Sequence, residues 1–190
     1  RGVADRSFDM PKDKIEPTVL AFTQEKKIID SESAKNGIKV MTLDDMRWKR
    51  CDIKTTQLLY ASMAKTEATE KGFDDAWMLR EGYITEGSSS NAWIIKGKII
   101  MTRQSDNLIL SGITRDAIFK CAKDLGYEVV TKNITLPDAQ SASEAFITSA
   151  TACVMPVVKI NASQIGDGKP GKFVTALREE YIKQALESSI

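Results

Sequence analysis

The chain has 190 residues, of which 42% are hydrophobic and 28% charged, a composition that supplies a globular protein with a sizeable core. Its 27 Lys and Arg residues balance 26 Asp and Glu residues, which excludes the basic face that nucleic-acid binding requires. The sequence has no histidine, which excludes Ser-His-Asp and Cys-His nucleophile systems and most zinc sites. Acid–base chemistry must therefore use lysine, carboxylate, tyrosine or a cofactor.

Targeting and cysteine signals are weak. No stretch approaches the roughly 18 apolar residues of a membrane span, and the N-terminus lacks a signal-peptide core, so we expect a cytoplasmic protein with no membrane partner. Cys51, Cys121 and Cys153 are widely spaced and odd in number, which predicts free, mostly buried thiols and no metal site. The chain opens on Arg1, and we expect an earlier segment to precede it.

The first third of the chain predicts two strands and a helix. Residues 17–23 and 37–43 have the composition and apolar spacing of strands. The polar interval between them predicts a link between domains. Residues 55–71 place small and apolar side chains on one helical face, and Gly72 is suited to end that helix.

Short strands and turns follow. The turn pairs Glu81-Gly82 and Lys96-Gly97 each separate two strand-like runs and predict tight hairpins. The predicted strands of this region are 76–80, 83–85, 91–95 and 98–102. Apolar spacing predicts a helix over 113–125, closed by Gly126.

The last third mixes both kinds of element. Residues 127–135, 144–148 and 154–160 predict strands, Leu136-Pro137-Asp138 predicts the start of a short helix, and 173–185 predict a closing amphipathic helix. Because helices and strands do not alternate strictly, an α+β fold is favoured over a doubly wound sheet.

Lys54 is the first candidate for chemistry. It lies between a strand-like stretch and the predicted helix, where a lysine can project from fixed backbone into a cleft and attack an aldehyde. An ordinary solvated lysine explains the position equally well.

Two further segments add candidates. In TEGSSSN, residues 85–91, small residues let Glu86 approach a cofactor ring, although a polar surface loop has the same composition. In LSGITR, residues 110–115, free N–H groups at a helix start and the Thr114 hydroxyl form a phosphate site. A simple threonine cap of the helix is the alternative.

Taken together, RW-x-RCDIK at residues 47–54, TEGSSSN and GITR resemble the pyridoxal 5′-phosphate (PLP) aminotransferases of fold type IV, and among them the D-amino-acid aminotransferases. The similarity runs over nearly the whole chain. It implies that residues 1–28 end a small N-terminal α/β domain and that residues 29–190 form a larger domain with a barrel-like sheet. It also implies a homodimer and transfer of an amino group from a D-amino acid, such as D-alanine or D-glutamate, to a 2-oxo acid.

The resemblance assigns roles to several residues. Lys54 would form the Schiff base with PLP and move the proton, and Glu86 would pair with the pyridine nitrogen. Arg47 would lie near the phenolic side of the ring, and Leu110 would pack against it. The phosphate would be bound by Ile113, Thr114, Ser149, Ala150 and Thr151.

The sequence departs from the family at two of these positions. Ala150 stands where the family has a second phosphate-binding threonine, so only the backbone N–H remains there, with Ser149 or Thr151 as substitute hydroxyls. Arg6 matches an arginine that binds the substrate carboxylate, across the dimer interface, but Phe8 replaces the accompanying histidine. Ser89 is the remaining substrate-binding candidate.

Four other interpretations stay open. A branched-chain aminotransferase usually has a tyrosine where this chain has Leu59, with Tyr60 one position later. An (R)-amine transaminase would tolerate Phe8, and an aminodeoxychorismate lyase would share Lys54 and Glu86. A binding module without catalysis would ignore PLP and stay colourless.

Overall fold

The computed structural model describes residues 2–188. Its strands in these residues form one mixed sheet, ordered β6-β5-β4-β8-β9-β1-β2-β3-β7, with β10 added on β9. The strands are β1 Ile38–Asp44, β2 Asp75–Arg80, β3 Tyr83–Gly87, β4 Asn91–Lys96, β5 Ile99–Thr102, β6 Glu128–Thr131, β7 Ile134–Thr135, β8 Glu144–Ser149, β9 Cys153–Ile160 and β10 Ser163–Gln164. The helices are α1 Glu32–Asn36, α2 Leu59–Glu70, α3 Ile113–Asp124, α4 Leu136–Gln140 and α5 Lys172–Glu187. The expected α+β class is confirmed.

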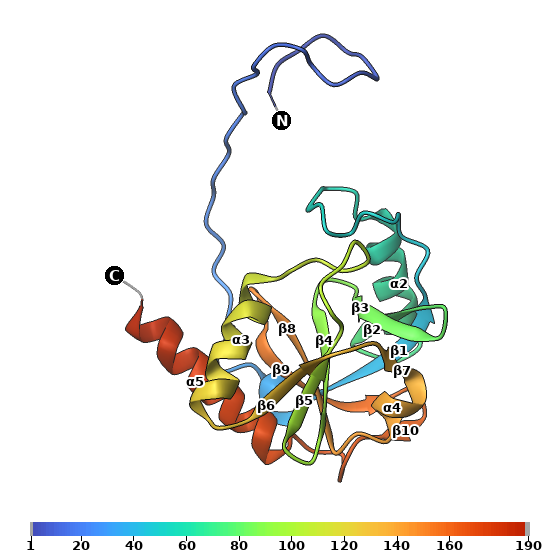
Figure 1. Ribbon diagram of the computed structural model, residues 1–190, viewed down its shortest axis with the longest axis vertical. Coiled ribbons are helices and arrows are strands. Elements are labelled where there is room, and N and C mark those ends of the chain that lie inside the picture. The colour runs from blue at the N-terminus through green and yellow to red at the C-terminus, as the bar shows by residue number, and fades with distance from the viewer. Residues whose placement is uncertain (1, 189–190) are drawn as a thin grey trace.

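The sheet curls strongly, as Figure 1 shows. β6 and β7 occupy the two ends of the strand order, yet only residues 132 and 133 separate them in sequence. So short a connection reaches about 10 Å, so the two ends of the sheet must approach each other. Side chains from both ends, such as Met101 of β5 and Ile134 of β7, accordingly share one buried cluster. The barrel-like sheet is confirmed.

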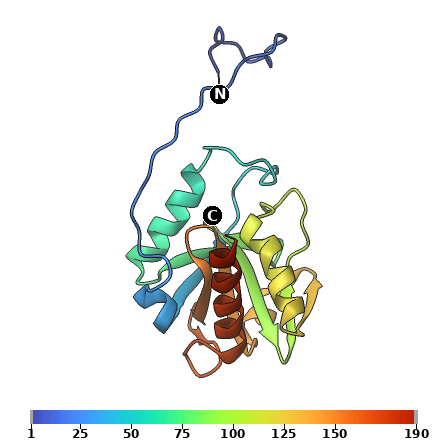
Figure 2. The ribbon, with the colours of Figure 1, turned by 90° about the vertical axis from the view of Figure 1, so that its left-hand side faces the viewer.

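Helices cover the outer face of the curled sheet (Figure 2). α3 and α5 pack on β4, β8 and β9, where the rings of Trp93 and Phe146 stack 5.3 Å apart and are fully buried. α2 packs on β1 and β2 through Ala64 and Ala68, which contact the same cluster as Met78. None of the helices in residues 2–188 is long and apolar enough to cross a membrane. The three cysteines are free and buried, as expected.

Most predicted elements are present, with small shifts at their ends. The first hairpin turns at Glu81-Gly82, whose φ angles of 53° and 81° suit a two-residue turn with a left-handed backbone. The second hairpin turns one position later than predicted, at Gly97-Lys98, because Lys96 pairs with Ile99. The predicted helix over 55–71 begins only at Leu59.

Two strand predictions were wrong. Residues 17–23 form no ladder, only a single bridge between Gly2 and Pro17, and Leu20 and Phe22 are exposed. Their apolar pattern lacks a partner strand. Residues 127–135 divide into β6 and β7, because the chain leaves β5 at one end of the sheet and joins β3 at the other.

The N-terminal segment is extended and lies apart from the sheet (Figures 1 and 2). It joins the body at Ile28 and Ile29, whose carbonyl oxygens accept hydrogen bonds from the buried Arg178 of α5 at 3.0 and 2.8 Å. The polar interval expected to be a link contains α1, which Ser31 caps through its side chain.

Candidate active site

Glu86 lies at the centre of the candidate site. It is near the end of β3, where only 5% of the residue is exposed, and its Oε1 accepts a hydrogen bond of 2.5 Å from Arg47. Its Oε2 accepts bonds from the Asn91 side chain at 3.2 Å and from the backbone N–H of Leu110 at 3.1 Å. Three segments far apart in sequence therefore hold one carboxylate.

Arg47 is itself held by Asp45, just beyond β1. The Asp45 carboxylate accepts bonds from Arg47 Nε at 2.9 Å and Nη2 at 2.8 Å, and a bond from the Thr85 hydroxyl at 2.7 Å. Arg80 adds bonds to the carbonyl oxygens of Asp45 and Arg47. Asp45, Arg47 and Glu86 thus form a buried charge network with two arginines and two carboxylates.

The pKa values follow from this arrangement. Burial raises the pKa of Glu86 above its usual range, although the charge and hydrogen bonds of Arg47 oppose the shift. For Asp45 burial acts in the same direction, but the bonds from Arg47 and Thr85 outweigh it and lower the pKa. Arg47, bonded to both carboxylates, has its pKa raised despite burial and keeps its charge.

Lys54 lies in the irregular segment between β1 and α2 and is exposed. The network is close to it in sequence, since Cys51 is anchored by a bond from its N–H to the Asn107 carbonyl at 2.9 Å. From residue 52 onward the segment is exposed up to Leu59. The carboxylate side of the site is therefore built from buried groups, whereas the amine side faces outward.

The expected phosphate-binding residues fall into two places. At the start of α3, Gly112 is the capping residue and no side chain caps the helix, so the first N–H groups are available to an anion. Thr114 is buried, and its hydroxyl lies 3.5 Å from that of Tyr181. Gly112 itself leaves no room for a side chain, because an added Cβ would meet Asn91 Oδ1 at 2.6 Å.

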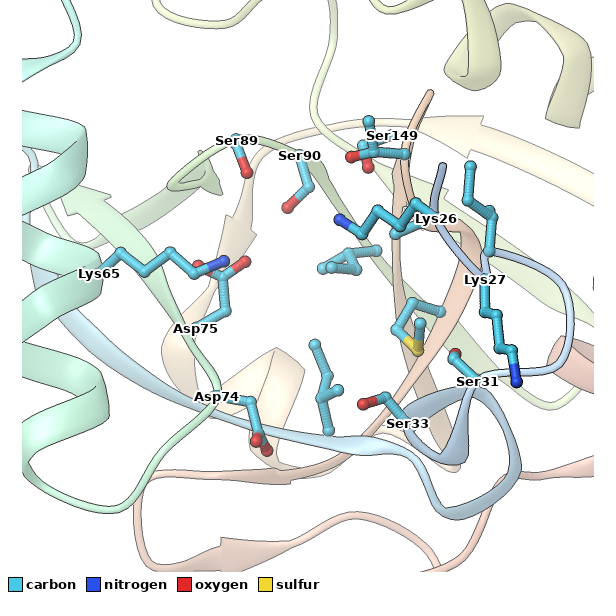
Figure 3. A pocket seen from close by; sticks show the side chains of 16 residues that line it. Lys26, Lys27, Ser31, Ser33, Lys65, Asp74, Asp75, Ser89, Ser90 and Ser149 are labelled. Atoms are coloured by element: carbon cyan, nitrogen blue, oxygen red, sulfur yellow. The ribbon is translucent and has the colours of Figure 1, made fainter. Parts of the chain in front are cut away.

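Ser149, Ala150 and Thr151 form the turn between β8 and β9. Ser149 and Thr151 line a cavity of about 330 Å³, together with Ser89 (Figure 3). The cavity also borders α2 and the segment that leads into α1. Lys54, Glu86 and Thr114 are not among its lining residues, so the predicted site residues lie around two neighbouring features rather than in one pocket.

Arg6 and Phe8 lie on the extended N-terminal segment, and Phe8 is fully exposed. Together with Ser7 they line a separate hollow of about 290 Å³. Within this one chain they do not meet the other predicted residues.

Three members of the network were missed by the sequence reasoning: Asp45, Arg80 and Thr85. Asp45 carried one usable signal, because an acidic residue directly follows a predicted strand and precedes Arg47 by two positions. The structure joins Arg47 to Glu86, and a position beside the phenolic side of a ring stays a prediction. Asn91 was part of the TEGSSSN motif but was given no role.

The residues present fit PLP. A carboxylate accepts about four hydrogen bonds, and Glu86 receives one on Oε1 and two on Oε2. One acceptor position on Oε1 remains for a protonated ring nitrogen. The uncapped start of α3 suits a phosphate, and the half-buried Leu110 lies between these two features in sequence.

The fold and this arrangement define an α+β protein built to hold a phosphorylated, nitrogen-containing ring. The family model described as amino-transferase class IV matches residues 1–160, and the chain belongs to that family.

Curated relatives include D-alanine aminotransferase of Staphylococcus aureus strain N315, 38% identical over 192 residues, covering 100% of this chain and 67% of the relative. D-alanine aminotransferase of Bacillus licheniformis is 39% identical over 174 residues, covering 92% of this chain and 59% of the relative. The chain therefore spans about two thirds of the length of these relatives.

Solved structures agree with the fold. A branched-chain amino acid aminotransferase from the source abbreviated T.th., with pyridoxamine 5′-phosphate, has a TM-score of 0.81 at 31% identity, covering 87% of this chain and 56% of that one. The same enzyme complexed with N-(5′-phosphopyridoxyl)-L-glutamate has a TM-score of 0.78 at 32% identity, covering 82% and 54%. The chain spans about half the length of these structures.

Proposed function

We propose that this chain is the cofactor-binding part of a PLP-dependent transaminase that moves the amino group of a D-amino acid, such as D-alanine or D-glutamate, to a 2-oxo acid. The observation that carries the proposal is the buried Glu86 carboxylate with one acceptor position open. Family membership and the D-alanine aminotransferases among its relatives support it. When bound, PLP acts as an electron sink that labilises the bonds at the substrate α-carbon.

Glu86 keeps a proton on the ring nitrogen in this proposal. A buried carboxylate attracts a neighbouring proton strongly because water does not screen it. Arg47 and the Leu110 N–H fix its orientation, so the acceptor on Oε1 has a defined direction. Asp45 acts through Arg47, because it balances the guanidinium charge and leaves Glu86 free to serve the ring.

Lys54 is the proposed covalent anchor for the cofactor aldehyde and the group that moves the proton at the α-carbon. A chain without histidine needs an amine or a carboxylate for this work, and an exposed lysine next to an anchored loop is accessible to the cofactor. Leu110 would pack on the ring. Ile113 and Thr114 would bind the phosphate, together with Ser149, the N–H of Ala150 and Thr151.

We further propose that residues 1–28 end a smaller domain, that 29–190 form the larger one, and that two chains pair. The extended segment supports both points, because it carries exposed apolar side chains that need a covering surface. Its members with exposures of at least 83% include Val3, Phe8, Met10, Val19, Leu20 and Phe22. Arg6 of such a segment would bind the substrate carboxylate of the partner site, beside Phe8 and Ser89.

The first test replaces the proposed anchor. Adding PLP to the protein should produce an absorbance band near the visible, and Lys54→Ala should abolish both that band and transamination. Lys49→Ala is the matched control, because Lys49 is exposed in the same segment, and it should keep both. A band that survives Lys54→Ala, or a wild-type protein that stays colourless, would contradict the proposal.

Substrate choice separates the proposal from its closest competitor. The solved structures named above are branched-chain aminotransferases, so L-leucine is the informative alternative donor. D-alanine should discharge the PLP band, and 2-oxoglutarate should restore it. Faster discharge by L-leucine than by D-alanine would replace D-specificity with the branched-chain alternative.

A further inference from the structure

The cavity beside Ser89 and Ser149 is lined unevenly by charge. Lys26 and Lys27 come from the segment before α1, and Lys65 comes from α2. Two carboxylates, Asp74 and Asp75, lie on the opposite wall. Both are engaged by protein donors, since Asp74 accepts the Lys39 N–H at 2.7 Å and Asp75 accepts the Ala76 N–H at 2.9 Å.

The three lysines differ in where their amines point (Figure 3). Lys65 extends toward Asp75, so its charge has a carboxylate in front of it. Lys27 turns its amine outward, away from the middle of the cavity. Lys26 extends its amine inward, in the direction of Ser90, and forms no ion pair with any residue of the described chain.

Ser90 supplies an independent observation. The residue is 8% exposed, it lines the cavity, and its hydroxyl is buried without a hydrogen-bond partner among the described residues. Figure 3 shows this hydroxyl on the cavity side of its backbone. A buried hydroxyl without a partner is costly, and an acceptor supplied by a ligand would satisfy it.

We propose that Lys26 and Ser90 bind the distal carboxylate of a dicarboxylic substrate, so that this chain favours acceptors such as 2-oxoglutarate over monocarboxylic 2-oxo acids. The inference rests on the proposed function. The loop that carries Ser89 and Ser90 follows Glu86 directly, so a substrate at the cofactor would direct its far end into the cavity. A volume of about 330 Å³ is sufficient for a small acid.

The cofactor phosphate has the same anionic chemistry but a different proposed place. The start of α3, with its uncapped N–H groups, is not among the segments that line the cavity. An anion bound by Lys26 is therefore a second anion, and the two sources can be separated by experiment.

The test compares adjacent lysines in the full-length, PLP-loaded enzyme. Lys26→Ala should raise KM for 2-oxoglutarate about tenfold, the loss expected for one charge-assisted hydrogen bond, and leave KM for pyruvate unchanged. Lys27→Ala should change neither value. Equal effects of the two variants, or equal effects on the two acceptors, would overturn the proposal, as would a weaker PLP affinity of Lys26→Ala.

A binding measurement removes the dependence on turnover. Succinate has two carboxylates and cannot react, so calorimetry should detect its binding to wild type, about tenfold weaker binding to Lys26→Ala, and weaker binding to Ser90→Ala. Butyrate should bind the wild type and Lys26→Ala equally. If transamination fails but succinate still depends on Lys26, the proposed function is wrong and the pocket stands. If D-alanine is transaminated but succinate ignores Lys26, only the pocket is wrong.

Discussion

The two halves of the candidate site are built differently. The carboxylate half consists of Asp45, Arg47 and Glu86, which are largely buried and joined by hydrogen bonds of 2.5 to 2.9 Å. The amine half is the exposed segment around Lys54. The difference shows which part of the site folding alone assembles. The ring-nitrogen partner is oriented by the fold, whereas the covalent anchor lies on a surface that a cofactor and a second surface can still cover.

The comparison predicts that substitutions in the buried half cost stability. Asp45→Asn should have the largest effect, about 3 kcal/mol of unfolding free energy, because it leaves Arg47 and Arg80 without a buried counter-charge. Urea denaturation measures this loss. Asp44→Asn, one position earlier and exposed, should stay within about 0.5 kcal/mol of wild type. Equal losses for both variants would show that the network contributes nothing special.

Glu86 gives a smaller effect with a characteristic pH dependence. Its pKa is raised by burial, so its contribution to stability is fully present below the ordinary pKa of a glutamate and is lost as the pH rises through the raised folded value. The unfolding free energy of wild type relative to Glu86→Gln should therefore fall as the pH increases through that interval. At neutral pH we expect the two proteins to differ by about 1–2 kcal/mol.

Denaturation of both proteins between about pH 3.5 and about pH 8 tests this sign, since the ordinary glutamate pKa is about 4.3. A difference that grows with pH would mean that Arg47 outweighs burial and lowers the pKa of Glu86 instead. Added PLP should stabilise wild type more than Glu86→Gln, because only the ionised carboxylate pairs with the ring nitrogen.

The limits of the sequence follow the same division between local and distant contacts. The Glu81-Gly82 hairpin was predictable because its turn chemistry lies in two adjacent residues. The partners of Glu86 were not, because Arg47 is 39 positions away and Leu110 is 24 positions away. Residues 17–23 show the opposite failure, since their apolar pattern suits a strand but cannot specify a neighbour. Motif order identified the family, and the network that orients Glu86 required coordinates.

Lys54 provides the smallest expected effect on stability and the sharpest contrast with Asp45. Because its side chain is exposed in an irregular segment, Lys54→Ala should change the unfolding free energy of the cofactor-free protein by less than about 0.5 kcal/mol. The contrast should reverse when PLP is present, because the wild type gains stability from a bound ligand and the variant loses its covalent attachment. Thermal denaturation with and without PLP measures both differences. A Lys54→Ala variant that is already destabilised without PLP would show that the amine is packed into the fold, and that the two halves of the site are assembled together.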